Sequence, residues 1–365
     1  MPRAVGQIQH EVVAIMHVRT LAVVGLFGLL TACAGRPLGE QFERHPAYVL
    51  PQGAMQVFYA RVDRLKGNPL AVWAYERGAN LDLGPSLEGT SQTLHLAGPI
   101  ARAVLGTFSG RGEEGPSAVI VATGRFDEEA FRKALDSGQI PYVESQYGQR
   151  RFFTCGRGDR RCYVSFPSKQ LVVAASKEDL LKRTLDLTRR GARSVAADQG
   201  LEPLFDSYAP DLDLWAIGFF PATLSGFLGP QLQGTVQMIR GFTIKVKGDD
   251  TEQLNLMLHC AAPEAAEANA AILQNVVRSV VQQVVDMGYR IPALVSVVNQ
   301  SEIVAKGLAV DLKMVLSKAD AAAIANGLRA EPVPPTVETL PPGMDTLPPA
   351  VLRPAPPRSP APPAP

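Results

Sequence analysis

The sequence lacks an excess of charge of either sign. Its 365 residues carry 36 Lys and Arg against 35 Asp and Glu, which gives a formal net charge of +1 at pH 7. Binding to the phosphates of a nucleic acid requires a strongly basic face or segment, and none stands out along the chain. We therefore expect no nucleic-acid partner. Because 46% of the residues are hydrophobic, a wholly disordered chain is also excluded.

Residues that carry chemistry are scarce. The chain has five His, and His10 and His17 lie in the targeting segment described below. The remaining three, His45, His95 and His259, are scattered without the spacing of metal ligands. Neither a G-x-x-x-x-G-K-[ST] phosphate loop nor a G-x-S-x-G elbow is present. The sequence thus predicts no metal, no cofactor and no catalytic residues, although a site built from distant residues is invisible at this level.

Apolar runs of 18 residues, the length that favours a membrane-spanning helix, are also missing. The longest candidate is residues 21–30 (LAVVGLFGLL), which Arg19 precedes and Thr31-Ala32-Cys33 follows. A basic residue, a short apolar run and small residues, in that order, are typical of a secretory signal peptide. A start at Met16 would give this signal an ordinary length. An uncleaved anchor or a buried helix is the alternative.

Residues 30–33, Leu-Thr-Ala-Cys, resemble the lipobox of bacterial lipoproteins. The resemblance implies that residues 1–32 are removed and that Cys33 is acylated on its sulfur and its new amino group. Acyl chains hold a soluble body on a membrane surface without a spanning helix. The family pattern further implies a periplasm-facing protein, and Ala34 after the Cys favours the outer over the inner membrane. Residues 33–53 are predicted to be the lipidated Cys and a spacer.

Prolines gather at the C-terminus. Fourteen of the 30 prolines lie in residues 332–365, so the globular part must end before this segment. We expect a disordered, polyproline-like tail. The tail is either a solvated linker or a ligand for an envelope protein or the cell wall.

The body shows signs of an internal repeat. Residues 111–114 (RGEE) and 247–250 (KGDD) lie 136 residues apart, and the same offset aligns an apolar run and a helix start after each. This pattern predicts two related units, residues 54–200 and residues 201–331. Chance similarity between two amphipathic stretches is the alternative.

A second pair of matching segments supports the repeat. Ser176 and Ser317 each follow an apolar run and begin a Ser-Lys-x-Asp motif that ends in Asp179 and Asp320, respectively. A Ser with an acid three residues later predicts a capping box at the start of a helix.

The order of the elements predicts an α+β fold. Helices are expected over residues 127–137, 177–190 and 264–287, and residues 142–175 have the pattern of a four-stranded antiparallel meander. A strand pair is expected over residues 302–316. The chain lacks the steady strand–helix alternation of a parallel sheet. We therefore predict two tandem units of antiparallel sheet packed with helices.

Two cysteines flank one turn of this meander. Cys155 and Cys162 lie at facing ends of two predicted strands, which favours a disulfide in an oxidising compartment. A metal pair is the alternative, although no His lies nearby. Cys260 follows an apolar run and is predicted to be a buried free thiol.

These observations favour a non-enzymatic function. We expect a lipid-anchored protein of the bacterial cell envelope that serves as a binding or assembly module, with the membrane as a partner through its lipid. The first alternative is a periplasmic carrier of lipid or another apolar ligand, bound in a groove between the long helix and the sheet. The second is a hydrolase whose site the sequence does not reveal.

The lipid anchor can be tested by changing Cys33 to Ser. Without the thiol no acyl chain can be attached, so the Cys33→Ser protein should leave the membrane fraction or become mislocalised. Fractionation of cells that process lipoproteins measures this. Unchanged membrane association would contradict the prediction.

Overall fold

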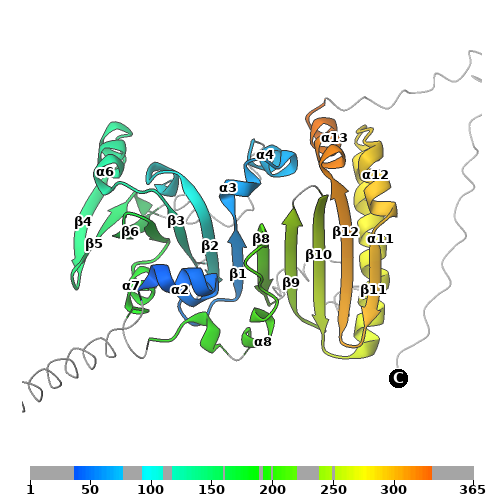
Figure 1. Cartoon of the computed structure of the whole chain (residues 1–365), viewed down its shortest axis with the longest axis horizontal. Coiled ribbons are helices and arrows are strands. Elements are labelled where there is room, and N and C mark those ends of the chain that lie inside the picture. The colour runs from blue at the N-terminus through cyan, green and yellow to red at the C-terminus, as the bar shows by residue number, and fades with distance from the viewer. Residues whose placement is uncertain are drawn as a thin grey trace, which may run out of the picture.

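A computed structural model of the chain describes residues 37–76, 93–109, 117–158, 161–188, 192–198, 200–219, 238–248 and 251–330. The predicted signal peptide, Cys33 and the Pro-rich tail lie outside these residues. The described part forms an antiparallel sheet with helices on both faces (Figure 1). This confirms the predicted α+β class.

Twelve strands of the described residues belong to one open sheet. Their bounds are β1 Gln56–Ala60, β2 Ile100–Phe108, β3 Ser117–Gly124, β4 Tyr142–Tyr147, β5 Arg150–Cys155, β6 Cys162–Ser168, β7 Leu171–Ala175, β8 Leu214–Gly218, β9 Ile239–Gly248, β10 Thr251–Cys260, β11 Glu302–Lys306 and β12 Ala309–Ser317. The predicted meander is β4 to β7, and the predicted C-terminal pair is β11 and β12.

The helices include one long element, α11, and several short ones. Their bounds are α2 Leu38–Arg44, α3 Val62–Leu65, α4 Pro69–Glu76, α6 Glu128–Ser137, α7 Glu178–Asp186, α8 Glu202–Phe205, α11 Pro263–Asp286, α12 Pro292–Asn299 and α13 Lys318–Arg329, with 3-10 turns η1 Pro46–Val49 and η3 Val195–Ala197. Helices α6, α7 and α11 match the three predicted helices. In α6, Asp127 accepts from the backbone of Glu129 and Ala130, as an N-cap should.

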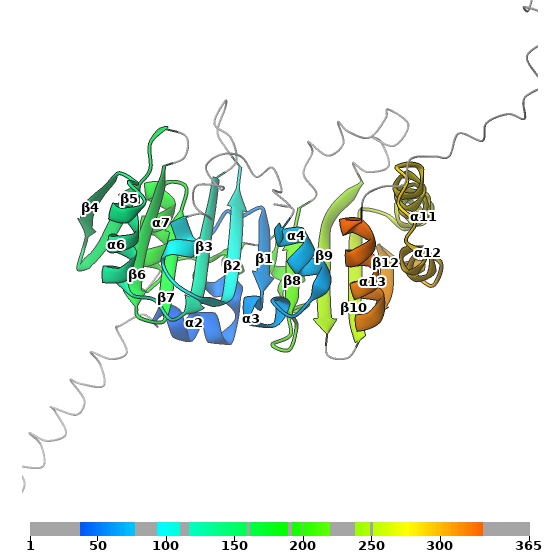
Figure 2. The ribbon, with the colours of Figure 1, turned by 90° about the horizontal axis from the view of Figure 1, so that it is seen from above.

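The order of the strands has an internal symmetry. From edge to edge it is β11-β12-β10-β9-β8-β1-β2-β3-β7-β6-β5-β4, as the two views in Figures 1 and 2 show. Read outward from the central β1–β8 pair, one half follows β1-β2-β3-β7-β6 and the other follows β8-β9-β10-β12-β11. Strands β5 and β4 extend the first half. The two halves thus share one continuous sheet, and the domain boundaries and the internal repeat given above stay predictions.

The two faces of the sheet bury different clusters. Side chains alternate along a strand, so the register assigns each one to a face. On the face covered by α2 and α7, here called the α2 face, Val57, Tyr59 and Trp215 form the centre of the largest cluster. On the opposite face, here called the α11 face, Phe131 of α6 packs in one cluster and Ala266 of α11 in another.

Helices α7 and α13 follow equivalent strands but pack on opposite faces. Leu181 and Leu185 of α7 are buried in the α2-face cluster with Val173 of β7. Ile324 of α13 packs instead with Leu316 of β12 on the α11 face. As a result, no helix of the described residues covers the α2 face of β9, β10 and β12, and Figure 1 shows these strands bare on that side.

The prediction that residues 33–53 form a spacer is wrong from residue 38 onward. Leu38 and Phe42, one helical turn apart on α2, are both buried, and so are Ala47 and Val49 of η1. The spacing of Leu38 and Phe42 gives α2 a single apolar face, which the intervening Gly-Glu-Gln conceals in the sequence. The segment belongs to the core of the α2 face.

The two predicted capping boxes differ in outcome. Ser317 accepts from the backbone of Asp320, whose side chain accepts in return from the Ser317 backbone, so the capping box at α13 is confirmed. At α7 the prediction was wrong. There the N-cap is Lys177, and the Ser176 hydroxyl accepts instead from the backbone of Ala118 on β3 at 2.9 Å. Contact with a neighbouring strand replaces the local cap.

His45 lies among aromatic rings where α2 joins η1. Its Nδ1 accepts from the backbone N–H of Ala47 at 3.1 Å, and its ring centroid is 4.5 Å from that of Tyr208 and 5.3 Å from that of Trp215. Burial lowers the pKa of His45, an effect that a backbone contact with Phe205 and the charge of Asp206 partly oppose. The folded protein therefore favours the neutral imidazole.

This burial predicts a pH dependence of stability. Because the unfolded chain binds the proton more tightly, His45 contributes its full stabilisation above about pH 6.5 and loses it as the pH falls toward its lowered folded-state pKa. His45→Asn keeps an N-cap acceptor but does not titrate. Urea unfolding at pH 7.5 and pH 5.5 should show a smaller loss of unfolding free energy in the variant.

His259 provides the internal reference for this experiment. Burial lowers its pKa too, so the His45→Asn protein should retain part of the dependence. The account of His45 fails if the variant and the unchanged protein lose the same free energy between the two pH values.

Candidate functional site

Of the predicted site residues, the structure describes Cys155 and Cys162 but not Cys33. Cys33 lies outside the described residues, so its lipidation stays a prediction. Cys155 and Cys162 face each other directly, as register partners at the ends of β5 and β6. Both side chains are fully buried.

In the structure Cys155 and Cys162 are free thiols in mutual contact. The hydrogen bond with Cys162, together with burial, raises the pKa of Cys155. The Cys162 Sγ lies 3.2 Å from the Thr93 hydroxyl. The hydrogen bond between the two thiols lowers the pKa of Cys162, but the full burial of both side chains disfavours a nucleophile. The predicted disulfide is not formed here, and the facing positions of the two residues keep it as a prediction for the oxidised protein.

No group of three or more potential metal ligands occurs among the residues that the structure describes. His95 and His259 lie on different elements, and Cys260 is buried, as predicted. Its neighbour there is Asn269 of α11, whose amide nitrogen lies 3.8 Å from the Cys260 Sγ.

The closest approach to a hydroxyl–imidazole pair is Thr243 with His259. The Thr243 Oγ1 and the His259 Nε2 are 2.9 Å apart on neighbouring strands. Thr243 is only 2% exposed, however. Beside this pair the backbones of β9 and β10 are paired with each other, so their N–H groups there take part in the sheet.

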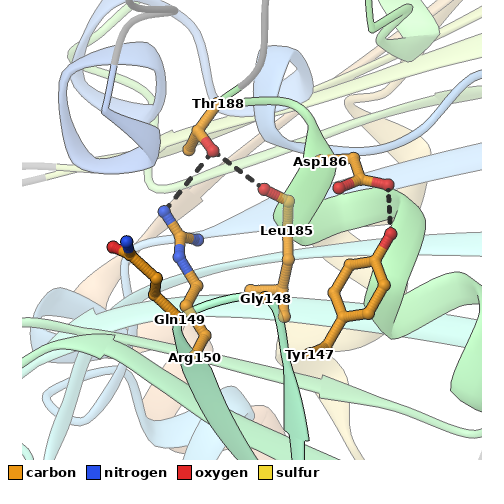
Figure 3. A pocket seen from close by; sticks show the side chains of 7 residues that line it. All are labelled: Tyr147, Gly148, Gln149, Arg150, Leu185, Asp186 and Thr188. Carbon is orange, nitrogen blue, oxygen red and sulfur yellow. Dashed lines mark hydrogen bonds between the residues drawn. The ribbon is translucent and has the colours of Figure 1, made fainter.

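A hollow of about 350 Å³ lies between the β4–β5 turn and the end of α7 (Figure 3). The Tyr147 hydroxyl donates to Asp186 at 2.8 Å, and Arg150 lies 3.4 Å from the hydroxyl of Thr188, which donates to the Leu185 carbonyl. A cation near the last turn of a helix is also favoured by the helix dipole. These contacts fasten the hairpin turn to the helix, which is a structural role.

A second hollow, of about 180 Å³, lies on the bare part of the α2 face. Its centre is a row of three residues on adjacent strands, in which Asn255 of β10 pairs with Lys245 of β9 on one side and Lys313 of β12 on the other. We call it the lysine hollow. The side chains that line it on this face are Thr243, Lys245, Asn255, Met257, Asp311 and Lys313.

The charges in the lysine hollow are unevenly paired. Asp311 lies 3.5 Å from Lys306, which compensates its charge. The neighbouring Lys247 is paired with Asp211, outside the hollow. Within the described part of the chain, neither Lys245 nor Lys313 forms an ion pair. The hollow therefore presents two lysines without an ion pair on either side of an amide, and Glu302 of β11 lies next to Lys313 as its register partner.

Sequence reasoning missed this hollow, although a signal was present. Residues 242–247 (FTIKVK) and 309–314 (AVDLKM) alternate between apolar and polar side chains, the pattern of strands with one solvent-exposed face. The juxtaposition of Lys245 and Lys313 depends on β12 pairing with β10, a contact that no single-strand pattern contains.

The long helix is only partly packed. Ala265, Ala266 and Ala270 near its start are buried, whereas Val280 and Met287 farther along are 51% and 58% exposed. The hollow between α11 and the β11 edge has a volume of about 110 Å³ and contains mainly polar lining residues: Gln274, Val277, Arg278, Val298, Asn299, Ser301 and Ile303. The described residues show no helix that is long and apolar enough to cross a membrane.

Comparison with known proteins gives a distant structural similarity. Crystal forms I, III and IV of a protein named TP0453 superpose with TM-scores of 0.43 to 0.44 and 10% to 12% sequence identity, over 77% to 78% of this chain and 96% to 97% of that one. At this level the likeness carries no argument about function. No protein-family model and no curated protein matches the chain.

The cysteine pair yields a direct test. Protein exported to the envelope is denatured and treated with a maleimide that shifts its mobility, with and without prior reduction. A Cys155–Cys162 disulfide leaves only Cys260 reactive without reduction, because Cys33 is expected to be acylated, and reduction should add two labels.

Cys260→Ser is the matched control, since it should remove the single label from the unreduced sample. Labelling of both Cys155 and Cys162 without reduction would contradict the disulfide.

Proposed function

We propose that this chain is a lipid-anchored protein of the bacterial cell envelope that acts as a non-enzymatic binding module, and that its binding surface is the bare α2 face of β9, β10 and β12. The proposal has two supports. One is the N-terminal sequence pattern, and the other is that a described helix covers the α2 face in the first half of the sheet but not in the second.

The first support concerns the tether. The lipobox-like residues 30–33 favour acylation at Cys33, and α2 begins at Leu38. Five residue steps span at most about 18 Å even when fully extended. An acylated Cys33 would therefore hold the folded body close to the membrane surface, with its α2 packed into the core.

The second support carries the proposal. In the first half of the sheet the α2 face is an apolar core under α7, whereas in the second half no helix of the described residues covers the equivalent face, on which Lys245, Asn255 and Lys313 lie. Its exposed side chains include Val315, at 57% exposure. A central part of a sheet that is left open on one side offers a broad, rigid surface on which a ligand or partner can bind.

The carrier alternative rests on the exposed apolar side chains of α11. Val276, Val280 and Met287 lie along one flank of this helix, at 39%, 51% and 58% exposure. The hollows described above have volumes of about 350, 180 and 110 Å³, so the exposed side chains of α11 favour contact with a surface over enclosure of a lipid. The hydrolase alternative draws only on the Thr243–His259 contact, which lacks an accessible nucleophile.

The binding surface can be tested by cysteine labelling in cells. Val315→Cys places a thiol on the bare face, and Val143→Cys on β4 is a matched control at 63% exposure. The described native cysteines are buried, so the background is low. If the bare face is occupied in the envelope, Val315→Cys should react with N-ethylmaleimide several-fold more slowly in cells than after purification.

The control should react equally fast in both settings. Equal rates for Val315→Cys in cells and after purification would overturn the proposal. A slowing that is the same for both variants would also overturn it, because it would show general crowding and not occupation of this face.

A further inference from the structure

We propose that the lysine hollow binds a phosphate or carboxylate group, held between Lys245 and Lys313 with the Asn255 amide as a donor beneath it. The inference rests on the proposed function, because it names the chemistry that the bare face recognises. It is carried by the geometry of one row of side chains and by the contrast with the equivalent row of the other half.

The row is set by the strand register. Lys245 and Lys313 are both register partners of Asn255, from opposite sides. Neighbouring strands lie about 4.8 Å apart, so the backbones of the two lysines are separated by about 10 Å, with the amide midway. Two flexible ammonium groups can converge on one anion above Asn255 from this separation.

The equivalent row in the first half has the opposite chemistry. Counting outward from the β1–β8 pair, it consists of Val57, Gly106, Val119 and Ala175. In the second half the row that begins at Trp215 continues with Lys245, Asn255 and Lys313. An apolar row under a helix in one half thus corresponds to an open, basic row in the other.

Neither strand propensity nor protection of a sheet edge explains why lysines stand at these positions. Lys is depleted in strands, and β9, β10 and β12 are interior strands, so the two residues do not serve to protect a sheet edge. Neither forms an ion pair among the described residues, and their like charges repel each other. Binding of an anion would relieve this repulsion.

The other polar groups that line the lysine hollow limit the kind of ligand that it can bind. The Asp311 charge is compensated by Lys306, and the Thr243 hydroxyl is within hydrogen-bond distance of His259. The groups left in the row are two ammonium ions and one amide, which suit an oxyanion. Glu302 of β11 is the register partner of Lys313 on the same face, but it forms no ion pair with Lys313 among the described residues. A volume of about 180 Å³ admits a single phosphoryl or carboxylate group and excludes a whole lipid. The anion can thus belong to a free molecule or to a lipid headgroup.

The test uses the mature chain, residues 33–365, carrying Cys33→Ser, so that neither an acyl chain nor the apolar run of residues 21–30 inserts into lipid by itself. Inorganic phosphate is titrated by calorimetry, and flotation measures binding to phosphatidylcholine vesicles with and without phosphatidylglycerol. The double variant Lys245→Gln/Lys313→Gln should bind at least about tenfold more weakly, because both charge-assisted contacts are lost.

Two control variants separate the site from general charge effects. Lys66→Gln/Lys169→Gln removes the same charge from two exposed lysines that no ion pair involves, and should bind like the starting protein. Lys245→Arg/Lys313→Arg keeps the charge of the hollow and should retain binding, which shows that the site tolerates substitution.

The phosphate titration and the vesicle flotation together distinguish a free anion from a lipid headgroup. Binding of phosphate that the Gln double variant loses supports the site with a free anion as ligand, and binding only to vesicles containing phosphatidylglycerol, lost in the same variant, supports a lipid headgroup. The inference is overturned if neither probe binds, or if the Gln double variant and its charge control behave alike. Protection of Val315→Cys in cells would still support the proposed function in that event.

Discussion

The pairing of β1 with β8 is the constraint on which the rest of the structure depends. These two strands join halves of the chain that lie more than 150 residues apart, through five register pairs from Gln56 with Gly218 to Ala60 with Leu214. The register directs Tyr59 and Trp215 to the α2 face, where both are buried. Truncating a buried aromatic side chain costs about 3–5 kcal/mol. A slip of one residue would exchange the two faces of the strand.

The two halves of the shared sheet differ in the face on which their last helix packs. In the first half α7 returns over the α2 face, and its leucines close a core against β3 and β7. In the second half α13 turns to the α11 face and packs with α12 and α4, where its capping box fixes its start. The strands are arranged alike, and the direction of the last helix decides which half is closed. The bare face and the lysine hollow follow from that one difference.

The sequence predicts local elements well because their signals are local. The cap at Asp127, the turns of the meander and the capping box at Ser317 each involve residues a few positions apart, and the structure has all three. Failures occur where distant contacts decide. Residues 38–53 contain two Gly and two Pro and read as a loop, yet Phe42 is buried against the sheet. Ser176 bonds to a strand 58 residues earlier in place of its own helix.

The same limit applies to the candidate site. The strand pattern around Lys245 and Lys313 indicates a solvent-exposed face, but only the sheet order shows that one residue, Asn255, separates them. The disulfide candidates Cys155 and Cys162 could be found because they flank a single hairpin turn. Sites formed across a hairpin are visible in one sequence, whereas sites formed between strands far apart along the chain are not.

The central claim is that an anion binds between Lys245 and Lys313 on the bare α2 face. The most direct measurement is NMR of the protein with ¹³C-methylated lysines, titrated with inorganic phosphate at constant ionic strength. The account predicts that the signals of Lys245 and Lys313 shift together and saturate, while those of Lys66 and Lys169 stay in place. Uniform shifts of all lysine signals, or none at the two hollow residues, would contradict it.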